Sequence, residues 1–149
     1  MDIKLHVAIT NNSIITSESV KLALSRLNPE RVGVSVEYME ILPFPRLVMN
    51  YIYKYNLDLV IMDYEMEKQD IPMYVQRIKA YNSNIKIILL AKIITPELIT
   101  LARRGIVDAF TTLPFQDANL WNAIERIYHP ERFPEELEEE TNEDIFVLE

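Results

Sequence analysis

Residues 58–63 read Asp-Leu-Val-Ile-Met-Asp, a run of four large apolar residues enclosed by two carboxylates. An uninterrupted apolar run of this kind is typical of a strand in a parallel sheet whose two faces are both covered. Four further runs of similar length lie along the chain, at intervals that leave room for helices. The five predicted strands are residues 3–9, 32–38, 57–62, 85–90 and 107–111.

The segments between the predicted strands show the apolar period of amphipathic helices. These stripes occupy residues 20–27, 47–55, 71–78, 98–102 and 120–128. Thr95 followed by Pro96 marks a helix start and Gly105 marks the end of that helix, while Thr16 or Ser17 is expected to cap the first helix.

Strict alternation of strand and helix predicts an α/β fold with a five-stranded parallel sheet and helices on both faces. This is a (βα)5 three-layer sandwich of flavodoxin-like architecture. In such a sheet the expected functional crevice lies at the carboxyl ends of the strands.

The charge of the chain is concentrated at its C-terminal end. The 149 residues carry a net charge of −8, and residues 131–149, with nine acidic residues and one basic residue, account for all of it. We therefore expect a neutral domain over residues 1–129 and an acidic, unstructured tail over residues 130–149. A domain without basic excess is not expected to bind nucleic acid.

The composition also excludes some kinds of functional site. The chain has no cysteine, and its two histidines, His6 and His129, stand at opposite ends, so we expect no metal site and no thiol chemistry. There is no secretory signal and no apolar run long enough to span a membrane, which makes a cytoplasmic protein the expectation.

Asp63 is the most informative polar residue, because it ends a predicted buried strand at the edge where the crevice should lie. On spacing alone, two interpretations remain open: a functional carboxylate facing the crevice, or a strand-end Asp that caps the following loop. Glu65 and Lys92 are candidates for the same crevice, Glu65 as a substitute for a phosphate's charge and Lys92 as an ion-pair partner of Asp63. A solvated position is the alternative for both.

Residues 58–71 resemble the signature of response-regulator receiver (CheY-like) domains, in which a strand ends in the phosphoacceptor Asp and a Met-Pro-x-Met-Asp-Gly loop follows. Met66 and Asp70 keep this pattern, whereas its Pro and Gly are lost. Residues 105–115 resemble the family's Gly-Ala-Asp-Tyr-Leu-Lys-Pro-Phe stretch, with one extra residue after the glycine and matches at Gly105, Asp108, Phe110, Pro114 and Phe115. The resemblance covers about residues 3–128.

Compared with the family, most residues of the phosphoryl chemistry are missing. The acidic pair that helps to hold Mg²⁺ corresponds to Ile9 and Thr10, which offer little to this ion. The phosphoryl-binding Ser or Thr corresponds to Leu90 or Ala91, and the conserved Lys to Leu113. Only Asp63, at the phosphoacceptor position, and Phe110, at the switching aromatic, remain. The resemblance therefore implies a degenerate pseudo-receiver, without cofactor or enzymatic activity, that acts through protein contacts.

The family's usual partner and dimer face corresponds to residues 97–104, 107–111 and 117–128. The resemblance implies a signalling partner, either a histidine kinase or a downstream effector, or a second copy of the chain at this face. Its candidate contact residues are Arg103, Arg104, Phe110, Trp121 and Arg126.

Two alternatives stay open. The first is a stand-alone response regulator phosphorylated on Asp63 by a histidine kinase. The second is a small-ligand binder of flavodoxin-like fold, in which the hydroxyls and amides of residues 10–13 hold a phosphate. Residues 145–148, Ile-Phe-Val-Leu, follow the acidic spacer and are a docking motif, a segment that packs on its own domain, or a frayed end.

Overall fold

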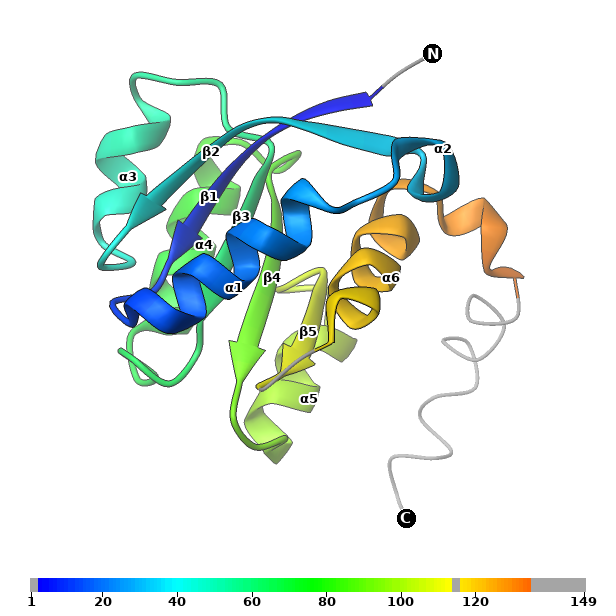
Figure 1. The fold of residues 1–149 in the computed structure, drawn as a ribbon. Coiled ribbons are helices and arrows are strands. Elements are labelled where there is room, and N and C mark those ends of the chain that lie inside the picture. The colour runs from blue at the N-terminus through cyan, green and yellow to red at the C-terminus, as the bar shows by residue number, and fades with distance from the viewer. Residues whose placement is uncertain (1–2, 114–115, 135–149) are drawn as a thin grey trace.

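The computed structural model describes residues 3–113 and 116–134. Its five strands form one parallel sheet in the order β2-β1-β3-β4-β5 (Figure 1). The strands are β1 Ile3–Thr10, β2 Val34–Leu42, β3 Leu59–Asp63, β4 Lys86–Ala91 and β5 Ala109–Thr112. The helices are α1 Ile14–Ser25, α2 Pro29–Val32, α3 Leu47–Ile52, α4 Ile71–Tyr81, α5 Pro96–Arg103 and α6 Asp117–Tyr128, followed by the 3-10 helix η1 Pro130–Arg132. The predicted fold class is confirmed.

The helices cover both faces of the sheet, so the core has two halves. One half packs the sheet against α3, α4 and α5, and the other packs it against α1, α2 and α6. Side chains of β3 alternate between them: Val60 and Met62 enter the first half, and Leu59 and Ile61 the second. All four are completely buried. Each such side chain contributes about 1.5–3 kcal/mol, which makes β3 a main source of stability.

The structure corrects the predicted boundaries around β2. Residues 32–38 were expected to form this strand, but Val32 ends the short helix α2 and the strand runs from Val34 to Leu42. Asn28 begins α2 by accepting a hydrogen bond from the Glu30 N–H (3.0 Å), and Gly33 ends it in a left-handed conformation, with φ +83°. These local signals stop the chain from entering the sheet at Val32.

Smaller differences concern the ends of other elements. Helix α3 ends at Ile52 although the apolar stripe continues to Tyr55, and β5 begins at Ala109 rather than at residue 107. The cap of α1 is Ser13, whose Oγ accepts from the Thr16 N–H at 3.3 Å, so the expectation of Thr16 or Ser17 was wrong. Thr95 caps α5 as predicted. No helix in residues 3–113 and 116–134 is long and apolar enough to cross a membrane.

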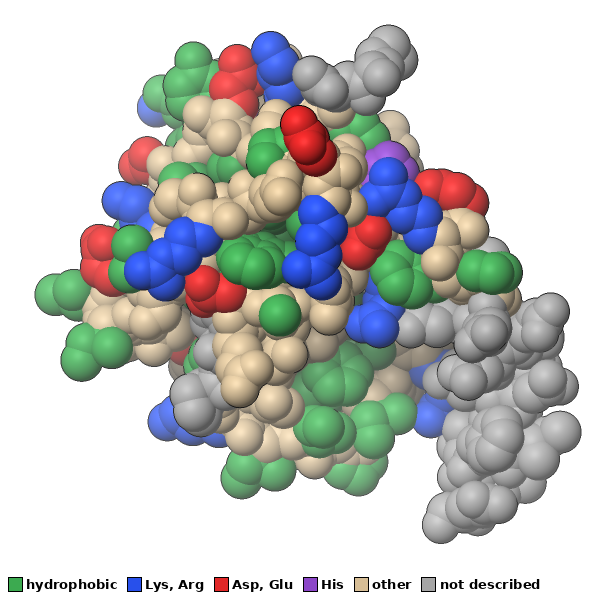
Figure 2. Space-filling model, turned by 45° about the vertical axis from the view of Figure 1, so that its right-hand side comes forward, with side chains coloured by type: hydrophobic (Ala, Val, Ile, Leu, Met, Phe, Trp, Pro, Cys, Tyr) green, Lys and Arg blue, Asp and Glu red, His purple; other side chains and the backbone are tan. Residues whose placement is uncertain are grey.

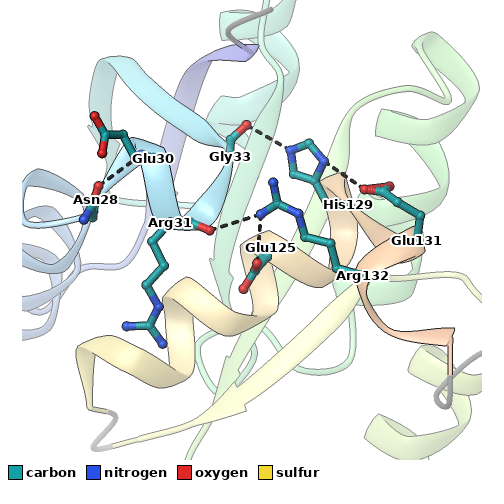
Figure 3. Close-up of polar contacts among 8 residues, drawn as sticks. All are labelled: Asn28, Glu30, Arg31, Gly33, Glu125, His129, Glu131 and Arg132. Atoms are coloured by element: carbon teal, nitrogen blue, oxygen red, sulfur yellow. Dashed lines mark hydrogen bonds and ion pairs between the residues drawn. The ribbon is translucent and has the colours of Figure 1, made fainter.

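The C-terminal part of α6 and η1 are fastened to the turn after α2 (Figure 3). His129 Nε2 donates to the Gly33 carbonyl at 2.9 Å, and Arg132 Nη1 donates both to the Arg31 carbonyl (3.0 Å) and to Glu125 Oε2 (2.9 Å). We call this set of contacts the C-terminal latch. These contacts reach Arg132, within residues 130–149 that were expected to form the tail, and residues 135–149 lie outside the described residues.

The latch predicts an unequal effect of two glycine substitutions. Both Gly33 and Gly105 have positive φ, which an alanine adopts at a cost of about 1–2 kcal/mol. A Cβ at Gly33 would also overlap the His129 ring, whereas a Cβ at Gly105 meets no heavy atom within 4 Å. We expect Gly105→Ala to lower the free energy of unfolding by about 1 kcal/mol and Gly33→Ala by about 2–3 kcal/mol, measured by chemical denaturation. Equal losses would show that His129 does not constrain Gly33.

Candidate functional site

The candidate site is the carboxyl edge of the sheet, where Asp63 ends β3. Asp63 is partly buried, and its Oδ1 accepts a hydrogen bond from the Glu65 N–H at 2.9 Å. Burial raises the pKa of the Asp63 carboxyl above its ordinary value, and the nearby Glu65 charge acts in the same direction, while the Glu65 N–H and Lys92 oppose them. Asp63 thus lies at the carboxyl edge of the sheet and also caps the next turn, and its functional role stays a prediction.

The side of Asp63 facing β4 is apolar. In the sheet register Asp63 lies opposite Leu90, and the Tyr64 N–H donates to the Leu90 carbonyl at 2.8 Å. Leu90 and Ala91 are both completely buried, in opposite halves of the core. Whichever of them occupies the position of a phosphoryl-binding hydroxyl, it supplies none.

The end of β1 offers no charged ligand either. Ile9 and Thr10 are completely buried, and Thr10 pairs with Met62, so the next residues on the two strands are Asn11 and Asp63. Asn11, which the sequence offered only as part of the phosphate-binding alternative, is thus the β1 neighbour of Asp63. It is buried, its Oδ1 accepts from the Ser13 N–H at 2.7 Å, and its carbonyl accepts from Ser17 Oγ at 3.2 Å.

These contacts weaken the phosphate-binding alternative for residues 10–13. The backbone N–H of Ser13 bonds to Asn11, and the hydroxyl of Ser13 caps α1. The Ser13 N–H, a backbone donor that a phosphate-cradling loop would point at its ligand, is here used inside the turn, and the Ser13 Oγ is an acceptor in the cap.

The receiver fold implies a Mg²⁺ ion at this edge, but the residues present do not fit one. Asp63 is the carboxylate that ends β3, and the residues beside it on the neighbouring strands are the amide Asn11 and the apolar Leu90, whereas Mg²⁺ requires several oxygen ligands in octahedral geometry. Within the described residues, no three His, Cys, Asp or Glu side chains are grouped so as to hold a metal.

Glu65 joins two loops at the mouth of the crevice. Its Oε2 accepts from the Lys92 N–H at 2.8 Å, and its Oε1 lies 3.3 Å from Lys68 Nζ. Partial burial alone would raise the pKa of Glu65, but the Lys92 N–H and the Lys68 ammonium group together lower it below its ordinary value. Glu65 is thus partly exposed and hydrogen-bonded to the loop after β4. Lys92 contributes its backbone N–H to Glu65, and the described contacts include no ion pair between Lys92 and Asp63.

Beyond β5, Leu113 stands where the resemblance places the lysine. Its N–H donates to the Ala91 carbonyl at 2.8 Å, and its side chain packs against the core half formed with α1 and α6. Phe110 is partly buried against the other half. Pro114 and Phe115 lie outside the described residues.

The candidate contact residues divide between two flanks of α6. Arg126 lies on the flank of α6 that faces β5. Arg103 and Arg104 lie at the end of α5, the helix that precedes β5 in the chain. Trp121 lies on the other flank, where its Nε1 donates to the Ala23 carbonyl of α1 at 2.6 Å. Trp121 therefore does not belong to the predicted face, because it is used to hold α6 against α1.

Exposed isoleucines surround the carboxyl edge. Ile14 and Ile15 begin α1 with exposures of 80% and 81%, and Ile93 in the loop after β4 is 70% exposed. Figure 2 shows hydrophobic side chains gathered at the lower end of the molecule, the end at which α5 begins in Figure 1. Exposed apolar groups of this size mark contact surfaces for other proteins more often than sites for ions.

Comparison with known proteins supports the fold. No protein-family model matches the chain, and no curated protein matches its sequence. Among solved structures, a response regulator from Thermotoga maritima has a TM-score of 0.66 at 20% identity over 85% of this chain and 98% of its own. Vibrio cholerae chemotaxis protein CheY4 has a TM-score of 0.66 at 19% identity over 85% and 99%. An orphan response regulator of H. pylori has a TM-score of 0.63 at 17% identity over 84% and 95%. The chain has the fold of receiver domains, as the resemblance implied.

The raised pKa of Asp63 predicts a pH-dependent effect of its removal. A carboxyl with a raised pKa stabilises the fold when protonated and loses this contribution as the pH rises through the raised value. Asn resembles the protonated form and keeps the acceptor for the Glu65 N–H. We expect Asp63→Asn to be more stable than the parent at pH 7, and the difference to vanish below about pH 3.9, the ordinary Asp pKa.

Chemical denaturation across this pH range measures the difference. Asp70→Asn, at an exposed carboxylate without a side-chain cap bond, is the matched control and should show no such gap. A less stable Asp63→Asn at neutral pH would mean that the hydrogen bond to the carboxylate outweighs the effect of burial.

Proposed function

We propose that this chain is a degenerate receiver, a non-enzymatic signalling module that acts through protein contacts and is not efficiently phosphorylated on Asp63. The main supporting observation is that the neighbouring strands bring no second carboxylate to Asp63: Leu90 on β4 is apolar and buried, and the residue that follows β1 beside Asp63 is the amide Asn11. Phosphoryl transfer depends on positioning and charge stabilisation. Loss of one electrostatic donor commonly lowers the rate by about 10²–10³, and three such elements are replaced here.

The bond between Glu65 and Lys92 supports a fixed rather than a switched state. In the family, a phosphoryl group on the Asp draws the hydroxyl at the end of the fourth strand toward it. Here Glu65 already ties the loop after β3 to the loop after β4 without a phosphoryl group. The proposed module therefore holds one conformation of this edge permanently.

The proposed module needs a protein partner, and two surfaces are candidates for binding it. The exposed Ile14, Ile15 and Ile93 support a protein contact at the carboxyl edge, and the face built from α5, β5 and α6 is the second candidate surface. A histidine kinase or downstream effector in the cytoplasm fits either surface. The alternative, a response regulator phosphorylated on Asp63, retains support from the position of this carboxylate at the end of β3.

A titration with Mg²⁺ and a small phosphodonor tests the proposal. We expect millimolar Mg²⁺ to leave the NMR spectrum around Asp63 unchanged, because a single carboxylate is a poor octahedral site. Incubation with acetyl phosphate and Mg²⁺ should leave the intact mass unchanged. Saturable Mg²⁺ binding together with a phosphoryl adduct, both absent in Asp63→Asn, would overturn the proposal and establish the alternative.

The Glu65 contact gives a separate prediction. Glu65→Ala removes the acceptor of the Lys92 N–H, and a hydrogen bond of this kind contributes about 0.5–1.5 kcal/mol. We expect hydrogen exchange at the Lys92 amide to rise by up to about tenfold, measured by NMR. Glu67→Ala removes a like charge from the same loop, at a side chain that contacts Tyr74, and serves as the control. Equal exchange in both variants would show that Glu65 does not hold the two loops together.

A further inference from the structure

A groove runs between β5 and α6, at the edge of the sheet. It has a volume of about 520 Å³, and its floor is formed by four consecutive residues, Asp108–Thr111. Asn119, Arg126 and Ile127 of α6 form one wall, and Phe133 lies at the end of the groove. We call it the β5–α6 groove.

The groove exposes a strand edge. Within the described residues β5 pairs with β4 on one side and is the last strand of the sheet on the other. A free edge presents unpaired N–H and C=O groups, which an extended segment can pair with as an additional strand.

The chain itself leads to this groove. Phe133, near the end of the described residues, lines the groove, and the Arg126 guanidinium lies 5.1 Å from the centre of its ring. The C-terminal latch holds this part of the chain through His129 and Arg132. The described chain therefore ends at residue 134, one residue after a side chain that lines the groove.

Composition matches this segment to the groove. Residues 135–149 contain eight acidic residues and no basic one, and they include Ile-Phe-Val-Leu at positions 145–148. Arg126 lines the groove, and the acidic lining residue Asp108 is paired with Lys79 at 2.8 Å. The acidic stretch is attracted to Arg126, and the apolar residues are suited to strand pairing.

The segment between the described chain and residues 145–148 is also long enough to bring these residues to β5. The ten residues 135–144 span up to about 33 Å when extended, whereas the four residues of β5 measure about 13 Å. Residues 145–148 can thus reach all of β5 in either direction. The other sheet edge, β2, is four strands away from β5.

We infer that residues 145–148 of this chain bind in cis along the free edge of β5 in the β5–α6 groove, guided by the acidic residues 135–144. The bound segment covers the face formed by α5, β5 and α6. The regulatory consequence rests on the proposed function: a partner that uses this face must first displace the segment. The intramolecular contact itself does not depend on the state of Asp63.

Disulfide trapping tests the contact directly, because the chain has no cysteine of its own. Asn119→Cys combined with Val147→Cys places one thiol on the exposed wall of the groove and one in the proposed strand. The control pair combines Val147→Cys with Arg77→Cys, an exposed position on α4. We expect the groove pair to form its intramolecular disulfide at least about tenfold faster than the control pair, by mass spectrometry under mild oxidation. Equal rates would overturn the inference.

Peptide binding provides the second measurement. A labelled peptide of residues 135–149 should bind a chain truncated after residue 134, and should bind the full chain at least about tenfold more weakly because the cis segment competes. Arg126→Glu in the truncated chain should weaken binding, whereas Arg77→Glu should not. A scrambled peptide of equal charge should bind poorly.

Each contrary outcome has a defined meaning. Equal binding to the two chains, or no binding to the truncated chain, contradicts the inference. Equal binding of the scrambled peptide shows charge attraction without strand pairing, and also contradicts it. None of these measurements uses Mg²⁺ or a phosphodonor, so their failure leaves the proposed function to its own test.

Discussion

The structure depends most on the burial of β3 from both sides. Leu59 and Ile61 enter one half of the core and Val60 and Met62 the other, and none of the four contacts solvent. Because β3 lies at the centre of the sheet, its register sets the positions of β1 and β4 and hence the residues that surround its end. Asp63 is carried to the carboxyl edge by this packing, and its environment follows from its neighbours rather than from its own sequence context.

That environment is unfavourable for the chemistry associated with the fold. Asp63 lies beside Leu90 and follows a strand whose neighbour ends in buried Ile9 and Thr10. A doubly charged ion and a phosphoryl group need compensating oxygens and cations, and this edge supplies neither in sufficient number. Burial raises the pKa of Asp63, which is the response of a carboxyl without a charged partner strong enough to offset desolvation. Glu65 instead places a carboxylate at the crevice mouth and satisfies it with the Lys92 N–H.

At the C-terminal end of the described chain, as at Glu65, polar groups are paired by hydrogen bonds between distant segments. The Gly33 and Arg31 carbonyls at the end of α2 accept hydrogen bonds from His129 and Arg132, which closes the seam between α2 and α6 (Figure 3). Helix carbonyls at this position have no partner within their own helix, so the donors from η1 satisfy groups that α2 leaves open. The same contacts bring Phe133 to the β5–α6 groove.

Much of this could be predicted from the sequence, because strands and helices differ in apolar period. The five strands, the long helices, the cap at Thr95 and the position of Asp63 at a strand end all follow from residues close to one another in the chain. The loss of a hydroxyl at Leu90 or Ala91 and of a cation at Leu113 is likewise visible in the sequence once the resemblance is recognised.

Other features required the tertiary structure. Glu65 meets Lys92 across 27 residues, His129 meets Gly33 across 96, and Trp121 meets Ala23 across 98. No local pattern encodes such pairs, because each depends on which strands are neighbours and on the side from which a helix returns. The sequence by itself determined the layers and the apolar character of the site. The tertiary structure decided the inward flank of Trp121 and the contact between Glu65 and the Lys92 N–H, because these depend on segments that only the folded sheet brings together.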